Sequence, residues 1–414
     1  MPAAVDPSRT LAELRELRAL TSDADGAQRV AFTPTWLQAR EFFRNKLAEL
    51  PVDVEQDPAG NLWATLRGDS PRALVLGSHL DSVPNGGWLD GCLGVFAGLE
   101  VLRRIAAEDA PPPFTVRLVD WADEEGARFG RSLYGSSAAS GALVLEDVRG
   151  LKDRDGVTLE TALANVGIDL NQALAAGSQL KDAAAYLELH IEQGPVLESL
   201  GLPMAAVLGT FGVERHQITF TGQAAHSGST PMKLRRDALA GVSQLHLAIR
   251  DIAERFGGVC TVGKVETKPG IVTAVVGEAT MTLDQRHLEA KTLERMYHEA
   301  QAASKRIAEE ESLEVAWKKI WDIQPFPFHS QLIDFADAAV REVCGVSHRL
   351  PSGPLHDAAE VCRIGVPTVM LFVQSLRGIS HNKIEDTQPE HLELAVRALD
   401  RLAARTLEWL AAGK

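Results

Sequence analysis

Imidazole and carboxylate side chains recur along this chain where short apolar runs end. Five of them could ligate a metal: His79, Asp90, Glu125, His190 and His381. Imidazoles and carboxylates without thiolates suit zinc, manganese, cobalt or nickel. A single histidine at such a point is more often structural, but five acid or histidine positions at separate strand ends are hard to explain by chance. If one carboxylate bridged two ions, the set would form two open hydrolytic sites about 3.5–4 Å apart. The spacing indicates metal binding without specifying a reaction.

The elements that must position these residues alternate between short apolar strands and amphipathic helices. Buried strands are expected at 72–78, 114–122, 184–192 and 366–373. A helical pattern follows Gly91, and others lie between the remaining strands. This alternation predicts an α/β fold with a mainly parallel sheet. The candidate ligands then lie at the carboxyl ends of the strands, where such sheets bind ligands.

The pattern changes from about residue 210 and returns to the earlier type near 328. The intervening segment reads strand, helix, strands, helix, strand, with its amphipathic helices near 234–256 and 289–311. That order is typical of an inserted α+β domain of ferredoxin-like type. We therefore expect a discontinuous first domain of residues 1–210 and 328–414, and an inserted domain of residues 211–327.

Composition excludes several classes of function. The formal net charge of -14 argues against nucleic acid or an anionic membrane surface as the main partner, since either would need a basic face. No apolar segment of about 18 residues and no signal-peptide pattern is evident, so a cytoplasmic location is the default expectation. The four cysteines include no CxxC pair, which argues against a disulfide scaffold or a thiolate zinc site.

Seven short motifs follow one another along the chain: "GSHLDSV", "DGCLGV", "EEGARFG", "LHIEQGP", "AHSGSTPM", "SGPLHDA" and "GISHN". In this order they resemble the motifs of the hydantoinase/carbamoylase family of zinc-dependent amidohydrolases. The match spans about residues 75 to 385, and the histidine in "LHIEQGP" replaces an acidic ligand of aminoacylase and dipeptidase relatives. The resemblance implies a di-zinc exopeptidase-like catalytic domain carrying an inserted lid and dimerisation domain.

The resemblance also implies roles for the candidate ligands. Asp90 would bridge two divalent ions, with His79 and His190 completing one site, and Glu125 and His381 the other. Asp81 would orient the imidazole of His79. Glu124 would be the general base, taking a proton from water and returning it to the departing amine. Because successive residues of an extended strand end point in opposite directions, Glu125 can face a metal while Glu124 faces the water, which leaves Asp123 as a bystander.

Substrate residues follow from the same motifs. The resemblance implies that His226 stabilises the developing oxyanion, that Arg286 binds a carboxylate, that Gln193 lines the pocket, and that His356 lies near the metals. Thr273 stands where the family usually has an asparagine. Because a threonine hydroxyl is shorter and cannot offer an amide's donor and acceptor together, the end of the substrate held there is expected to differ from a plain amino acid carboxylate.

The predicted activity is hydrolysis of a linear C–N amide bond in a small molecule with an amide or ureido group and a carboxylate, first of all an N-carbamoyl-L-amino acid. Allantoate, ureidoglycolate and N-acyl-amino acid hydrolysis are close alternatives. A catalytically inactive relative that binds a small molecule is a remote one, since all five ligands and Glu124 are present. A homodimer through the inserted domain is expected by resemblance.

Overall fold

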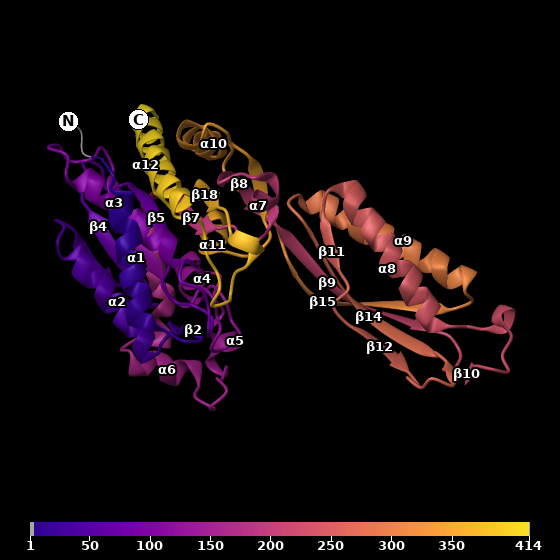
Figure 1. Ribbon diagram of the computed structural model, residues 1–414. Helices are drawn as coiled ribbons and strands as arrows, with labels where there is room; N and C mark the ends of the chain where they lie inside the picture. Colours follow the sequence, from indigo (N-terminus) through magenta and orange to yellow (C-terminus); the bar gives the residue numbers. More distant parts are fainter. Residues whose placement is uncertain (1–3, 414) are drawn as a thin grey trace. The chain divides into compact units, whose positions relative to one another are not determined.

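The computed structural model describes residues 4–413 and divides into two compact units. One unit is Met1–Leu208 with Phe328–Lys414, and the other is Gly209–Pro327. Each unit can be followed by colour and label in Figure 1. Within the described residues, no helix is both long enough and apolar enough to cross a membrane.

The first unit is built on a mixed sheet whose order is β16-β8-β18-β7-β5-β6-β4-β3, with β17 paired to β8. Its end strand β16 pairs with Gly209 and Thr210 of β8, and these residues belong to the second unit by the division above. The bounds of its strands are β3 Asp53–Gln56, β4 Leu62–Leu66, β5 Ala73–His79, β6 Thr115–Trp121, β7 Ala183–Ile191, β8 Met204–Thr210, β16 Phe326–Pro327, β17 Arg349–Ser352 and β18 Thr368–Val373. The four neighbours β18, β7, β5 and β6 run parallel, and the pairs β3 with β4, β4 with β6, and β8 with β18 are antiparallel. The predicted α/β fold is confirmed, with its parallel part at the centre of the sheet.

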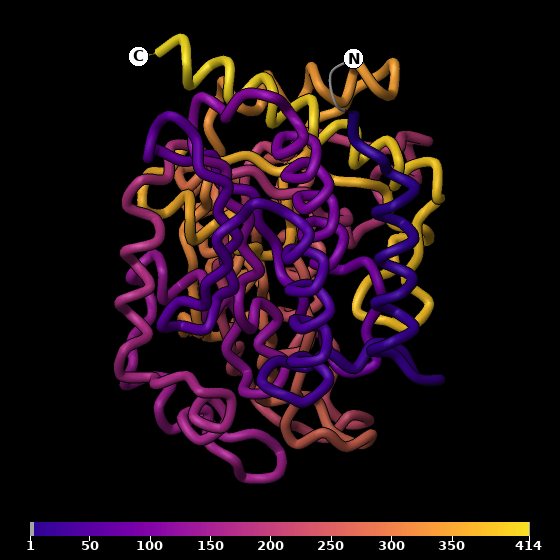
Figure 2. The backbone as a smooth tube through the Cα atoms, turned by 90° about the vertical axis from the view of Figure 1, so that its left-hand side faces the viewer, coloured from indigo at the N-terminus to yellow at the C-terminus, as the bar shows by residue number. Residues whose placement is uncertain are grey.

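Helices cover this sheet. They are α1 Pro7–Thr21, α2 Pro34–Leu47, α3 Cys92–Ala106, α4 Tyr134–Ser140, α5 Leu145–Arg149, α6 Leu159–Asn165, α7 Val196–Leu200, α10 Ser330–Cys344, α11 Asp357–Arg363 and α12 Pro389–Ala412, with 3-10 turns η1 Leu170–Leu180 and η3 Leu376–Gly378. A short hairpin joins β1 Ser22–Asp23 to β2 Gly26–Ala27. The N-terminal helix α1 packs against α3 and the C-terminal helix α12, and in Figure 2 these ends of the chain are indigo and yellow.

The central strands β5, β6, β7 and β18 are buried along nearly their whole length because both faces of the sheet are covered. Every residue of β5 and β18 is buried. Gly77 in β5 has no room for a side chain, since an added Cβ would lie 2.6 Å from Val119 and 2.8 Å from the hydroxyl of Tyr186. Close packing of this kind holds the carboxyl ends of β5, β6 and β7 at one edge of the sheet.

The second unit is an antiparallel sheet of order β11-β14-β9-β15, with β12 paired to β14. Its elements are β9 Gly212–Thr221, β10 Ala225–His226, η2 Met232–Leu234, α8 Ala238–Phe256, β11 Val259–Thr261, β12 Val265–Lys268, β13 Ala274–Val275, β14 Glu278–His287, α9 Ala290–Glu310 and β15 Glu314–Ile323. Burial alternates along β14, and the buried side packs with apolar residues of α8 and α9 in a separate core. The unit is therefore a two-layer α+β fold with one open sheet face.

Candidate metal centre

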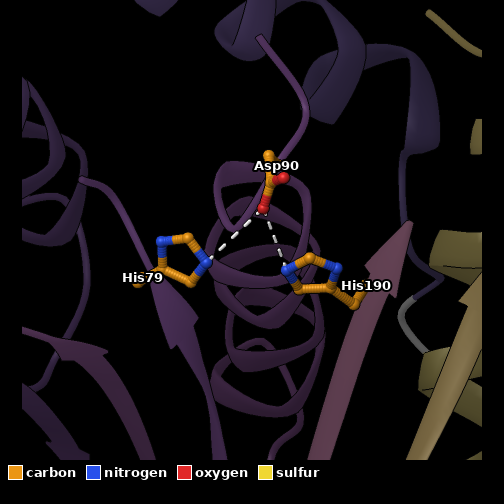
Figure 3. A group of neighbouring side chains, drawn as sticks. All are labelled: His79, Asp90 and His190. Carbon is orange, nitrogen blue, oxygen red and sulfur yellow. Dashed lines mark ion pairs between the residues drawn. The ribbon is translucent and has the colours of Figure 1, made fainter. Parts of the chain in front are cut away.

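Three buried side chains converge where β5 and β7 end. His79 closes β5, His190 lies near the end of the parallel neighbour β7, and Asp90 lies in the loop before α3. Asp90 Oδ1 is 3.6 Å from His79 Nε2 and 3.2 Å from His190 Nε2. In Figure 3 the two rings approach this carboxylate from opposite sides. All three residues are at most 2% exposed, so the group is enclosed by protein.

A second group shares the same aspartate. His381 Nε2 lies 3.5 Å from Asp90 Oδ2 and 3.2 Å from Glu125 Oε2. Asp90 therefore presents one carboxylate oxygen to each group, as a bridging ligand would. The groups differ in exposure, because the His381 side chain is 49% exposed while those of Asp90 and Glu125 are at most 5% exposed.

The free atoms of the first group fit a divalent cation. His79 Nδ1 lies 3.1 Å from the carbonyl of Asp81, and His190 Nδ1 lies 2.9 Å from the carbonyl of Ile191. Those carbonyls can only accept, so each Nδ1 donates, and in the neutral form of each imidazole the Nε2 lone pair is directed at Asp90. Both Nε2 atoms and Glu125 Oε1 are buried without a hydrogen-bond partner among the described residues. Buried polar atoms left in this way are expected where an ion binds.

The charges in the site favour such an ion. Burial alone would raise the pKa of Asp90, but the surrounding imidazoles of His190, His79 and His381 hold it below its ordinary value. Burial would lower the pKa of His79, whereas the carboxylates of Glu124, Asp81 and Asp90 raise it well above normal. A cation that binds here must therefore displace a proton, which makes metal affinity fall at lower pH.

The acid run at the end of β6 is arranged by a turn. The strand ends at Trp121, and Asp123 has a left-handed φ of 57°. The backbone N–H groups of Glu124 and Glu125 donate to the two oxygens of Asp81, each at 3.2 Å. The expectation that strand alternation separates the two glutamates was therefore wrong. The Asp81 carboxylate accepts hydrogen bonds from both backbone amides. The resulting turn directs the side chain of Glu125 towards His381 and that of Glu124 towards His79.

Glu124 has the surroundings of a general base. Its Oε2 lies 3.7 Å from His79 Nε2, and the residue is 7% exposed. Burial raises the pKa of its carboxyl well above normal; the charge of His79 opposes this, and Asp357, Glu125 and Asp81 add to it. A carboxylate with a raised pKa holds a proton more readily, which suits a group that must take one from water.

Asp81 contacts His79 chiefly through its backbone. Its carboxylate Oδ1 is 3.5 Å from His79 Nδ1, farther than its own carbonyl oxygen at 3.1 Å. The carboxylate instead accepts hydrogen bonds from the backbone N–H groups of Glu124 and Glu125 and so fixes the turn that carries them. Asp81 thus positions both the imidazole and the acids.

Gln193 and His356 also lie at this centre. Gln193, with a left-handed φ of 57°, donates from Nε2 to Asp90 Oδ2 at 2.8 Å. The His356 ring centroid lies 4.5 Å from that of His190, and these two histidines form a further potential ligand group with Glu188. Glu188 accepts from the Tyr186 hydroxyl and from the Ala358 N–H, at 3.0 and 3.1 Å.

Two contributing acids were not predicted from the sequence. Glu188 lies two positions before His190 on a strand, and this spacing places both on one face, so the signal was present. Glu385, discussed below, contacts the loop of Asp90 from almost 300 residues away, and no local pattern marks it.

The remaining candidates lie in the second unit. His226 pairs with Ala274 across β10 and β13, and the Ser227 N–H donates to the Thr273 carbonyl at 3.0 Å, so His226 and Thr273 are neighbours. His226 Nδ1 accepts from the N–H groups of Gly228 and Ser229 at 3.1 and 3.2 Å. Its Nε2 then carries the proton and is a donor suited to a carbonyl oxygen.

Arg286 lies near the end of β14, where its guanidinium pairs with Asp284 at 2.8 Å. Asp284 also binds Arg215 at 2.7 Å, so one carboxylate is shared between two guanidinium groups. Arg286 already binds Asp284 in bidentate geometry, with Nε donating to Oδ1 at 2.8 Å and Nη2 to Oδ2 at 3.2 Å.

Comparison with known proteins shows similarity over nearly the whole chain. The model of peptidase family M20/M25/M40 matches residues 75–405. The N-carbamoyl-L-amino acid amidohydrolase of Geobacillus stearothermophilus is 34% identical over 377 residues, which is 90% of this chain and 92% of that protein. The allantoate amidohydrolase of Escherichia coli (strain K12) is 34% identical over 384 residues, covering 91% and 92%.

Solved structures of family members are also similar to this chain over nearly its whole length. A hydantoinase/carbamoylase family amidase from Burkholderia ambifaria has a TM-score of 0.87 at 30% identity and covers 98% of both chains. An amidase of the same family from Burkholderia multivorans has a TM-score of 0.85 at 32% identity, covering 97% of this chain and 98% of that chain.

Proposed function

Since this chain belongs to peptidase family M20/M25/M40 and its relatives hydrolyse linear amides, we propose that it is a two-metal amidohydrolase acting first of all on an N-carbamoyl-L-amino acid. The observation that carries the proposal is the carboxylate of Asp90, which offers one oxygen to His79 and His190 and the other towards His381, beside the buried acid Glu124. The net reaction consumes one water and releases the amino acid, ammonia and carbon dioxide.

Two divalent ions would be held by the two groups that share Asp90. His79 and His190 would complete the first site, and Glu125 and His381 the second. Nitrogen and oxygen donors of this kind suit zinc, and also manganese, cobalt or nickel. When bound, such ions supply Lewis acidity, which lowers the pKa of water and neutralises charge on the attacked carbonyl oxygen.

Glu124 would move the proton. Its carboxylate removes a proton from the attacking water, holds it on one oxygen, and gives it to the nitrogen that leaves as the C–N bond breaks. Burial helps because the protonated carboxyl is favoured in a site with little water. His226 would donate from Nε2 to the carbonyl oxygen as negative charge develops there.

The substrate's other end would be held through its carboxylate. Arg286 would bind a carboxylate, with Thr273 offering one hydroxyl, while Gln193 and His356 would line the pocket beside the metals. The chain passes from one unit to the other at residues 208–209 and 327–328.

Hydrolysis of allantoate or ureidoglycolate is the second candidate. The 34% identity to an allantoate amidohydrolase supports it, and so does Thr273, whose short side chain leaves more room than an asparagine would. Both substrates carry ureido groups, so the same acid and the same ligands would serve. Hydrolysis of N-acyl-amino acids, which releases no ammonia, is the third candidate.

The test is a substrate panel on purified protein loaded with each candidate metal. N-carbamoyl, ureido and N-acyl compounds are compared by release of ammonia and of free amine, with chelated protein as the control. We expect ammonia from an N-carbamoyl or ureido compound only when metal is present. If metal analysis finds well under two ions per chain and no compound is hydrolysed, the chain is a binding protein instead of an amidohydrolase.

We also propose a homodimer formed through the second unit. Its exposed apolar side chains include Met232, Leu234, Ile271 and Val272, of which the last is 99% exposed. Large apolar side chains exposed in this way are often covered in an interface. Light scattering coupled to gel filtration should give twice the 44.7 kDa chain mass, and a monomer mass at micromolar concentration would contradict the proposal.

A further inference from the structure

One buried glutamate lies within an exposed loop. Glu385 belongs to the segment 379–388 between η3 and α12, and it is 2% exposed. Its neighbours Ile384 and Asp386 are exposed. A carboxylate is rarely buried unless other groups in the protein satisfy it. Its partners therefore indicate why it lies there.

The first oxygen of Glu385 holds the loop of the shared metal-binding aspartate. The backbone N–H groups of Leu89 and Asp90 both donate to Glu385 Oε1, each at 3.1 Å. These bonds fix the backbone at Asp90 itself.

The second oxygen reaches the residue next to His381. Ser380 Oγ lies 2.9 Å from Glu385 Oε2 and 2.7 Å from Asp90 Oδ2. One glutamate thus connects the backbone of Asp90, its side chain through Ser380, and the segment that carries His381. No comparable link runs from Glu385 to His79 or His190 in the hydrogen bonds of the described residues.

His381 needs such support. It has a left-handed φ of 54°, which is strained for a residue other than glycine, and its side chain is half exposed. A ligand with a strained backbone and little packing keeps its direction only if its segment is fixed from elsewhere.

Gly87 shows how closely the two loops meet. A Cβ added to Gly87 would overlap the carboxyl group of Glu385. Gly87 is not among the glycines with positive φ, so its backbone accepts other residues and the limit is the space that Glu385 fills. Any side chain at position 87 would therefore push the Glu385 carboxylate away.

We propose that Glu385 is a positioning residue of the second metal site. Its hydrogen bonds hold the His381 segment next to the Asp90 loop. The inference rests on the metal binding proposed above but not on the identity of the substrate. Its distinctive consequence is asymmetry. Loss of Glu385 should weaken the site of Asp90, Glu125 and His381 more than the site of His79, Asp90 and His190, because only the former includes the His381 segment that Glu385 holds. Removing such outer partners commonly lowers metal affinity by about 10–100-fold.

The experiment measures zinc binding to the metal-free full chain by calorimetry, with ion counts by mass spectrometry. In Glu385→Ala we expect first-site affinity within about threefold of wild type and second-site affinity lower by at least about tenfold. Glu385→Gln keeps an acceptor for the two N–H groups and a donor for Ser380, so it should bind both ions nearly as wild type does. Glu390→Gln, an exposed glutamate in the first turn of α12, is the matched control and should change neither site.

A second variant tests the same link without removing the acid. Gly87→Ala should weaken the second site as Glu385→Ala does, because its methyl group displaces the carboxylate. The double variant should be no worse than Glu385→Ala alone, since the methyl group then enters the space that the glutamate vacated. Gly87→Ala also allows the inference to be tested if Glu385→Ala fails to fold.

The outcomes separate the inference from the proposed function. Two ions bound with wild-type affinity by both Glu385→Ala and Gly87→Ala would overturn the inference, and so would equal loss of both sites or an additive double variant. If the wild-type chain itself binds fewer than two ions, the two-metal proposal fails and this inference with it. If two ions bind but no carbamoyl compound is hydrolysed, only the substrate proposal fails.

Discussion

Replacing Glu124 by glutamine tests the assignment of the general base with little change in shape. The amide has nearly the same size as the carboxyl group, and the backbone N–H of residue 124 keeps its bond to Asp81. Glu124 belongs to neither group of potential ligands that contains Asp90. Glu124→Gln should therefore keep its metal ions while losing the atom that accepts the proton.

The expected loss follows from what else in the site could accept a proton. General base catalysis contributes about 10²–10⁴-fold, or about 3–5 kcal/mol at 1.36 kcal/mol per tenfold. Asp90 and Glu125 would be committed to ions, and the Asp81 oxygens already accept two backbone N–H bonds. None of these three carboxylates is free to replace Glu124. We therefore expect kcat to fall by about 10³-fold or more.

The assay is steady-state turnover on the best compound of the panel, with metal content measured on the same samples. Glu125→Gln serves as the contrasting variant and should lose metal as well as activity. If Glu124→Gln holds two ions and keeps kcat within threefold of wild type, Glu124 is not the base. If it loses an ion, Glu124 acts as a ligand and the division between the two glutamates is wrong.

Four further results are expected. Chelation should lower the melting temperature, because two ions each present at 100 times Kd would stabilise the fold by about 2.7 kcal/mol apiece; an unchanged melting temperature would contradict metal binding. Burial raises the pKa of Cys92 from 9.0 to about 11, so between these values the unfolded thiol ionises first and stability falls as pH rises. The fall should reach about 2 kcal/mol at pH 11 and disappear in Cys92→Ala, as followed by urea unfolding. Thr273→Asn should lower KM for N-carbamoyl-L-amino acids by about tenfold, the worth of one added hydrogen bond, and an unchanged KM would remove Thr273 from the pocket. Tyr186→Phe should cost about 2–4 kcal/mol of unfolding free energy, since the Trp121 indole N–H loses its acceptor and Glu188 loses a donor; a cost under 0.5 kcal/mol would show that water replaces the hydroxyl.

Much of the architecture followed from local patterns. Apolar runs of strand length alternate with amphipathic helices, and that alternation is enough to predict an α/β layer and an inserted α+β segment, because burial imposes its period on the sequence. The parallel centre of the sheet then requires the ends of β5, β6 and β7 to meet, which brings His79, the acids after β6 and His190 to one edge. The antiparallel flanks at β3, β4 and β8 were not predicted, since a short buried strand reads alike in either direction.

The sequence by itself determined which side chains could ligate an ion and roughly where each would lie. Only the tertiary structure decided how they act. It showed that a left-handed Asp123 and the Asp81 carboxylate direct Glu124 and Glu125, and that Glu385 fixes the loop of Asp90. The reason is that hydrogen bonds between distant segments depend on how the loops pack, and a bond spanning 295 positions leaves no periodicity or local motif by which it could be found.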